Sequence, residues 1–225
     1  MIRVSGAGSF YEDGNVKDTS GNHSLLPKYA SGSKVIVENG ACWTNVSGKS
    51  TYMASDSPSH DNDFIVRNGG YLHLKNAFHI GRAGPLNHFS VMDGSSASVL
   101  GELFVGVAAT SYGNTALVTT NSWLRNSHHI GIGYGGSASN RMDVVGANAA
   151  VTNTAYDIGV GRAANYNTLR IADGGSVYGS RRFAVGAPLS FDSSTVVCGP
   201  VGNTALVEGK GSILHNKGNA SGSYV

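Results

Sequence analysis

The sequence predicts an all-β protein folded as a right-handed parallel β-solenoid (β-helix), with three short strands in each turn of about 26 residues. Two repeated features predict this fold. A hydrophobic residue followed by Gly recurs 25 to 28 residues apart, at Gly81, Gly106, Gly131, Gly159 and Gly186. A polar residue recurs 26 or 27 residues apart, at Asn87, Asn114, Asn140, Asn167 and Ser194. A fixed period of this length indicates stacked units in place of a conventional globular core.

The first strand of each unit is expected to point inward two and four residues after the polar residue, which we call the anchor. A spacing of two places both side chains on one face of a strand. Counting from anchors Ser33 and Asn62 onward, these inward pairs are Val35/Val37, Phe64/Val66, Phe89/Val91, Ala116/Val118, Met142/Val144, Leu169/Ile171 and Val196/Cys198. The pattern therefore predicts one inward column over seven turns.

A tight turn and a second strand are expected next. The turn residues are Asn39-Gly40, Asn68-Gly69, Asp93-Gly94 and Asp173-Gly174, where Gly supplies the positive φ that tight turns require. Inward candidates on the second strand are Leu72/Leu74, Ala97/Val99, Ala150 and Val177. No helix is expected, because the chain has no long 3.6-residue period with a cap.

The third strand is expected to point inward three residues and one residue before the repeated Gly. The first of these columns contains Phe78, Leu103, His128, Tyr156 and Phe183, and the second contains Ile80, Val105, Ile130, Ile158 and Val185. This alignment makes His128 a core histidine. It also places His79, Phe104 and His129 in one outward column, with Asp157 one turn further.

The anchors are expected to lie one above another along the stack. Stacked asparagines can hydrogen-bond along such a column, as they do in cross-β packing. The expected ladder is Asn62, Asn87, Asn114, Asn140 and Asn167. A single turn buries too little apolar surface to fold alone, so stability should be cooperative along the stack.

We expect a single domain, with an irregular N-terminal turn and loop over residues 1–32 and solenoid repeats over 33–225. Ser194 and Asn203 are both candidates for the anchor of the last turn. Met1–Gly6 looks like a strand followed by a turn, so the chain is expected to be a piece of a longer protein that starts inside a repeat. Uncapped solenoid ends expose strand edges that can pair with another chain.

The repeats resemble those of autotransporter passenger regions and of exosortase-sorted surface proteins. The resemblance covers residues 33–200. It is clearest in Asn167 to Val177 followed by Phe183 to Gly186, and in Asn62 to Gly81 and Asn87 to Gly106. It implies an extracellular or cell-surface β-solenoid and supplies no catalytic residues to transfer.

Composition excludes several classes of function. Only 13% of the residues are charged and the net charge is +2, so no basic stripe indicates nucleic-acid binding. No apolar run is long enough to cross a bilayer. Cys42 and Cys198 lie six turns apart, about 29 Å at the spacing of β-strands, which is too far for a disulfide.

A carbohydrate-active enzyme, lyase or hydrolase, is one alternative. Glycoside hydrolysis needs two carboxylates about 5 to 9.5 Å apart, and Asp61 and Asp63 form the one i, i+2 acidic pair. We interpret them as solvated turn residues. His79 and His129 would lie two turns apart, too far to share a metal, so no metal or cofactor is expected.

Glycan binding is the other alternative. Arg82 and Arg162 follow repeated glycines, and with Arg125, Arg170, Arg181 and Arg182 they could line a shallow face for anionic glycans. Tyr71, Trp123 and Tyr178 are outward on the second strand, where a flat row of aromatic rings can stack on sugars. The predicted binding residues are Arg82, Arg162, Tyr71, Trp123 and Tyr178, which would form one face if the arginine and aromatic columns are coplanar. The leading hypothesis is a non-enzymatic structural or adhesive module that assembles end to end with copies of itself or with neighbouring solenoid segments. Surface glycans are further expected partners, whereas nucleic acid and membrane insertion are not.

Overall fold

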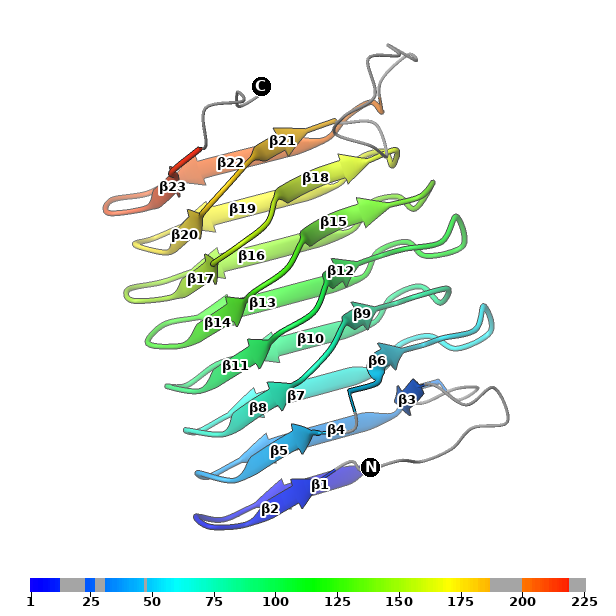
Figure 1. The fold of residues 1–225 in the computed structure, drawn as a ribbon, viewed down its shortest axis with the longest axis vertical. Coiled ribbons are helices and arrows are strands. Elements are labelled where there is room, and N and C mark those ends of the chain that lie inside the picture. Colours follow the sequence, from blue (N-terminus) through cyan, green and yellow to red (C-terminus); the bar gives the residue numbers. More distant parts are fainter. Residues whose placement is uncertain (13–22, 27–30, 47, 187–199, 219–225) are drawn as a thin grey trace.

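The computed structural model describes residues 1–12, 23–26, 31–46, 48–186 and 200–218. These described residues contain β-strands and no helix, and the strands form three parallel sheets that wind as a β-solenoid (Figure 1). One turn takes about 27 residues. The structure therefore confirms the predicted all-β solenoid with three strands in each turn.

Each sheet collects one strand from every turn. Sheet A contains β1 (Ile2–Ser5), β4 (Lys34–Glu38), β7 (Asp63–Arg67), β10 (His88–Val91), β13 (Thr115–Thr119), β16 (Arg141–Val145), β19 (Thr168–Ala172) and β22 (Thr204–Glu208). Sheet B contains β2 (Phe10–Glu12), β5 (Cys42–Asn45), β8 (Tyr71–Leu74), β11 (Ser96–Val99), β14 (Trp123–Asn126), β17 (Ala150–Asn153), β20 (Ser176–Gly179) and β23 (Ile213–Asn216). Sheet C contains β3 (His23–Leu26), β6 (Ser50–Met53), β9 (Phe78–Ile80), β12 (Leu103–Val105), β15 (Ile130–Tyr134), β18 (Ile158–Arg162) and β21 (Phe183–Val185).

The core is a set of inward columns that run along the stack. On sheet A, Phe89 lies beside Phe64 of the previous turn and Ala116 of the next, and all three are buried. Aromatic rings concentrate toward the N-terminal end, where the ring centroids of Phe78 and Phe89 are 5.0 Å apart in an edge-to-face arrangement. Burial of these columns drives folding, because each turn supplies an apolar floor for the next.

An asparagine ladder runs along the interior at the start of sheet A. Each amide Nδ2 donates to the Oδ1 of the next asparagine over 2.9 to 3.1 Å. The backbone N–H of each asparagine donates to the same Oδ1 over 2.9 to 3.2 Å. The members are Asn62, Asn87, Asn114, Asn140, Asn167 and Asn203. The ladder satisfies amide groups that would otherwise be buried without partners.

Asn203, rather than Ser194, is the anchor of the last described turn. Asn167 donates to Asn203, and β22 then places Ala205 and Val207 beside Leu169 and Ile171. The inward pair of that turn is therefore Ala205/Val207. Ser194, Val196 and Cys198, the other candidates for this turn, lie outside the described residues.

The repeated glycines pack against the ladder. Gly81, Gly106, Gly133 and Gly161 have φ between +67° and +78°, a region that favours glycine. A Cβ at any of them would also come within 2.2 Å of the side chain of the second anchor that follows it in the sequence, as at Gly81 and Asn114. Glycine is thus required here by conformation and by the close approach of the asparagine.

This contact corrects the predicted alignment of the third strand. Gly133 and Gly161, rather than Gly131 and Gly159, occupy the repeated position, because they contact Asn167 and Asn203. The sequences Ile-Gly-Ile-Gly and Ile-Gly-Val-Gly each contain two copies of the signature, and the prediction took the first. The first inward column contains Phe78, Leu103, Ile130, Ile158 and Phe183. The second contains Ile80, Val105, Ile132, Val160 and Val185.

Two consequences follow for residues near sheet C. His128 and Tyr156 precede their strands and lie on the outside, so the prediction of a core histidine was wrong. The outward column that contains His79 and Phe104 continues through Gly131 and not through His129.

Two glycine substitutions separate backbone strain from contact with the ladder. Gly94 has φ +73° and nothing within 4 Å of an added Cβ, whereas Gly106 has φ +78° and meets Asn140 at 2.2 Å. G94A should lower the free energy of unfolding by about 1 to 2 kcal/mol through strain alone. G106A should lower it by about 2 kcal/mol more, because the ladder must shift. Urea denaturation of both variants measures the difference, and equal losses would contradict the role of the ladder.

Candidate functional site

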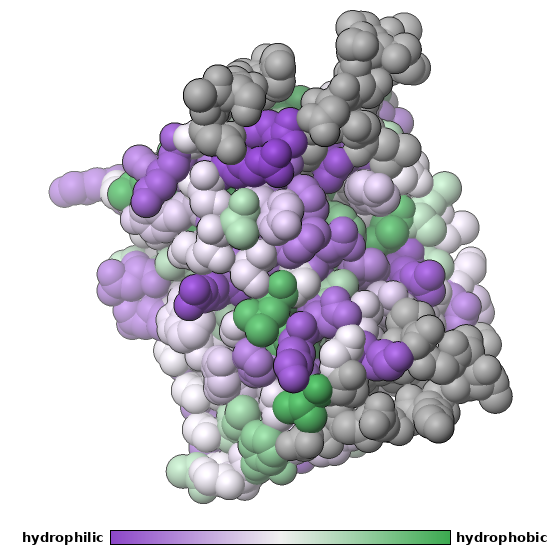
Figure 2. All heavy atoms as spheres, in the orientation of Figure 1, coloured by the Kyte–Doolittle hydropathy of each residue, from purple (hydrophilic) through white to green (hydrophobic). Residues whose placement is uncertain are grey.

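One group of ionisable side chains gathers at the corner between sheets B and C. Glu102, His129, Asp157 and Arg182 each immediately precede a strand of sheet C, so they stack in consecutive turns. The residues before three of them are His128, Tyr156 and Arg181. We call these seven residues the corner cluster. Figure 2 shows the face crossed by sheet C, where hydrophilic side chains surround small apolar patches.

Asp157 is the fixed anion of the corner cluster. It is 1% exposed and accepts hydrogen bonds from Nε and Nη2 of Arg182 at 3.1 and 3.2 Å. It also accepts the backbone N–H of Arg182 at 3.2 Å, and Nε of Arg181 lies 3.8 Å away. A carboxylate that accepts hydrogen bonds from one guanidinium group and lies beside a second forms a structural ion pair.

Glu102 lies between two histidines. Its carboxylate oxygens are 3.9 Å from Nε2 of His79 and 3.9 Å from Nδ1 of His128. His128 in turn stacks on Tyr156, with ring centroids 4.2 Å apart. Across the described parts of the chain, no three His, Cys, Asp or Glu side chains come close enough together to hold a metal ion.

His129 is the one group here with a large change in pKa. Burial, followed by the neighbouring His128 and Arg162, lowers the pKa of His129 to about 4. The imidazole therefore stays neutral in the folded protein at neutral pH. Its ring packs against Tyr156 at 5.0 Å, so its principal role is to fill the corner.

An aromatic stack covers the outer face of sheet C. The ring centroids of Tyr52 and His79 are 5.0 Å apart, those of His79 and Phe104 5.2 Å, and those of Phe104 and Tyr134 5.0 Å. Gly131 leaves the space that Phe104 occupies, because a Cβ there would lie 2.4 Å from the ring. Tyr52 and Phe104 are 7% and 5% exposed, so this face is largely filled by its own side chains.

The structure divides the five predicted glycan-binding residues between two faces. Arg82 lies over the ring of Tyr52 at 4.6 Å, and Arg162 lies over the ring of Tyr134 at 5.6 Å. These two arginines therefore close the ends of the aromatic stack of sheet C. Arg162 is only 9% exposed.

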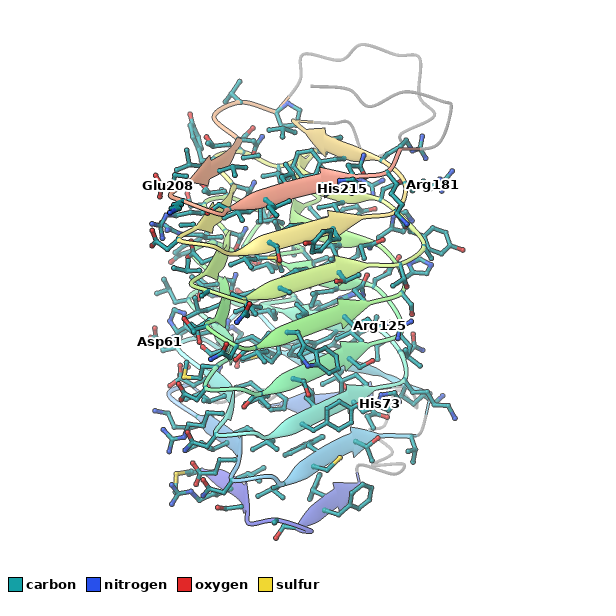
Figure 3. The ribbon with its side chains drawn as sticks, turned by 90° about the vertical axis from the view of Figure 1, so that its left-hand side faces the viewer. Asp61, His73, Arg125, Arg181, Glu208 and His215 are labelled. Atoms are coloured by element: carbon teal, nitrogen blue, oxygen red, sulfur yellow. The ribbon has the colours of Figure 1, made fainter. Side chains whose placement is uncertain are left out.

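Tyr71, Trp123 and Tyr178 lie on the outer face of sheet B, which faces the viewer in Figure 3. Tyr71 and Trp123 share one column with Ser96 between them. Tyr178 lies in the neighbouring column, which also contains His73, Arg125 and His215. Arg125 was expected on a face with Arg82 and Arg162 and lies instead on sheet B. His73 and His215 were not predicted as part of the face, although their spacing of two from the aromatic column was a usable signal.

The predicted acidic pair does not form a catalytic arrangement. Asp61 lies in a turn and interacts with His60 at 2.6 Å, and Asp63 pairs with Lys34 at 3.1 Å. Each carboxylate is thus matched by its own basic partner. Glu102 and Asp157 lie two turns apart with His129 between them, about 10 Å at the strand spacing.

No family model, curated protein or solved structure matches this chain. A search of the described residues for a helix able to cross a membrane finds none. The surfaces of the solenoid are therefore the source of evidence for its function.

The half-buried His129 predicts a loss of stability in acid. Its pKa is about 4 in the folded chain, whereas an unperturbed histidine has a pKa of 6.5. Between these values the unfolded chain binds the proton and the folded chain does not, so the free energy of unfolding falls as pH drops. H129Q should remove this part of the decrease. Urea denaturation at about pH 7 and about pH 5 measures the decrease in the free energy of unfolding for the wild type and for H129Q. H215Q, which removes an exposed histidine, is the matched control. Equal acid sensitivity in wild type and H129Q would contradict the assignment.

Proposed function

We propose that this chain is a stiff, non-enzymatic structural or adhesive module of a secreted or cell-surface protein, and that its ends stack on further copies of itself. The observation that carries this proposal is the state of the two terminal turns. The ladder runs from Asn62 to Asn203 and the inward columns of sheet A from β1 to β22, yet the described inward side chains of sheets A and B at both ends are partly exposed.

The exposed fractions show how far the ends are open. Ile2 is 43% exposed, although its neighbour Val35 in the same inward column is 6% exposed. At the opposite end Val207 is 43% exposed, although its neighbour Ile171 is fully buried. Tyr11, beside Trp43, is 37% exposed. Apolar side chains left uncovered in a row favour association with a matching surface.

The two ends are complementary to each other. Figure 1 places β1 and β2 at one end of the stack and β22 and β23 at the other. If β1 of one copy pairs with β22 of the next in the register used throughout sheet A, Ile2 covers Ala205 and Val4 covers Val207. The outer edges of both strands then gain the hydrogen bonds that every interior strand already has. Repetition of this head-to-tail contact generates a filament, because it does not close on itself.

The surface-protein assignment is supported by the low content of charged residues, 13%, and by the resemblance to repeats of surface proteins. An enzymatic role is less well supported, because the acidic groups considered as a catalytic pair are bound to basic side chains. A rigid rod whose outer columns keep a constant spacing suits the display of repeated side chains to a surface.

Adjacent residues on β22 test end-to-end assembly. Val207 points inward and Leu206 points outward beside Arg170. V207K should abolish filament growth, because a lysine would be buried without a partner against the next copy. L206Q should leave growth unchanged, because residue 206 points outward between Arg170 and Arg3 of the next copy, where a neutral polar side chain stays solvated. Negative-stain electron microscopy and light scattering across a concentration series report both results. A wild-type chain that stays monomeric at high concentration, or a V207K variant that still elongates, would overturn the proposal.

A further inference from the structure

We propose that the outer face of sheet B, from β5 to β23, binds an acidic polysaccharide. This inference concerns the side of the rod and does not depend on end-to-end stacking. It rests on three observations: the distribution of charge, the exposed aromatic rings and a pocket at one end of the face.

The charges on this face are all of one sign. Its basic side chains are His73, Lys75, Arg125, His215 and Lys217, and no carboxylate occurs at the outward positions of β5 to β23. Figure 3 shows His73, Arg125 and His215 on the same side of the solenoid. Lys75, Arg125 and Lys217 take part in none of the salt bridges found among the described residues. Unneutralised positive charge of this kind attracts an anionic ligand.

Sheet A shows the opposite arrangement. Its outward arginines and lysines are paired with acids on the same sheet, as in Lys34–Asp63 at 3.1 Å and Arg170–Glu208 at 2.6 Å. The basic face on sheet B is thus not a general property of the surface. It is a local segregation of charge along one side of the rod.

Exposed aromatic rings accompany the positive charge. Trp123 is 45% and Tyr178 is 39% exposed, and Tyr71 lies two turns before Trp123 in the same column. Two turns correspond to about 9.6 Å along the stack. That spacing suits successive disaccharide units of an extended polysaccharide, each with one sugar ring on an aromatic face.

A pocket lies at the C-terminal end of this face. It has a volume of about 340 Å³, and its lining residues include Thr152, Thr154, Tyr178, His215 and Lys217. The rings of Tyr178 and His215 are 6.2 Å apart. A sugar ring can lie on Tyr178 with its carboxylate or sulfate toward Lys217 and His215, while the threonine hydroxyls bond to the sugar hydroxyls.

The spacing of the basic groups favours a polysaccharide over nucleic acid. The basic residues occur in turns that are two or three steps apart, roughly 10 to 14 Å. Phosphates of a nucleic-acid strand in a duplex follow one another every ~3.4 Å along the axis, and tight binding would need a denser row of cations. An acidic polysaccharide with one anionic group for each disaccharide matches the wider spacing.

Binding of defined polymers tests the proposal. Hyaluronan, with one carboxylate for each disaccharide, and κ-carrageenan, with one sulfate for each disaccharide, are titrated into the purified chain by calorimetry at low salt, with neutral dextran and a single-stranded DNA oligonucleotide as comparisons. We expect at least one of the two acidic polysaccharides to bind, dextran not to bind, and the affinity to fall with added salt. The two acidic polymers distinguish carboxylate from sulfate as the preferred group.

Matched variants locate the site. Y178A and K217A should each weaken binding by about tenfold, as expected for residues that make the principal contacts with a ligand. Y112A and K210A remove an exposed tyrosine and an exposed lysine outside this face and should leave the affinity unchanged. Thermal melts of all four variants verify folding.

Three results would overturn the assignment. The first is no binding of either acidic polymer to the wild-type chain, or equal binding of neutral dextran. The second is an equal loss of affinity in the control variants. The third is tighter binding of DNA than of both polysaccharides through Tyr178 and Lys217, which would make the ligand a nucleic acid.

Discussion

The hydrogen bonding of the buried anchor amides is the constraint on which this structure depends. Asn114 accepts from the backbone and the side chain of Asn87 and donates to Asn140 and to Ser111 Oγ. A buried amide of this kind is stable only when all its partners are present. Each turn must therefore place an asparagine directly above that of the previous turn along the solenoid axis. That requirement fixes the register of sheet A and the glycine that packs against the ladder, whereas the number of residues between asparagines varies from 25 to 36.

The fixed register determines what the outside of the molecule can do. Because every strand pairs with its equivalent in the next turn, an outward residue is always part of a column with the spacing of the stack. Charged and aromatic residues at equivalent positions of successive turns therefore line up along one side of the rod. The corner cluster shows the same effect, since Asp157 and Arg182 occupy equivalent positions in consecutive turns and pair for that reason.

The sequence predicts the first strand of each turn well, the second with one error and the third less well, for a physical reason. Ala150, predicted to point inward, pairs with the outward Trp123, and Val151 is the buried residue of that strand. Alternating apolar residues after an anchor identify an inward column directly, as with Phe89 and Val91. At Ile130-Gly131-Ile132-Gly133 the local pattern fits two alignments two residues apart, and only contact with Asn167 from the next turn selects Gly133. The glycan-binding face was hard to predict for a similar reason. Arg82 and Tyr71 are both outward, but sequence spacing does not reveal that a corner of the solenoid separates them.

The three outer faces differ in how much of their binding capacity is already used. Sheet A neutralises its basic residues with its own acids, such as Asp143 with Arg141. Sheet C fills its face with stacked rings that are closed by Arg82 and Arg162. Sheet B keeps its exposed rings and positive charges available to solvent within the described part of the chain. A ligand that is anionic and rich in hydroxyl groups gains most on sheet B, because there it does not have to displace an existing internal partner.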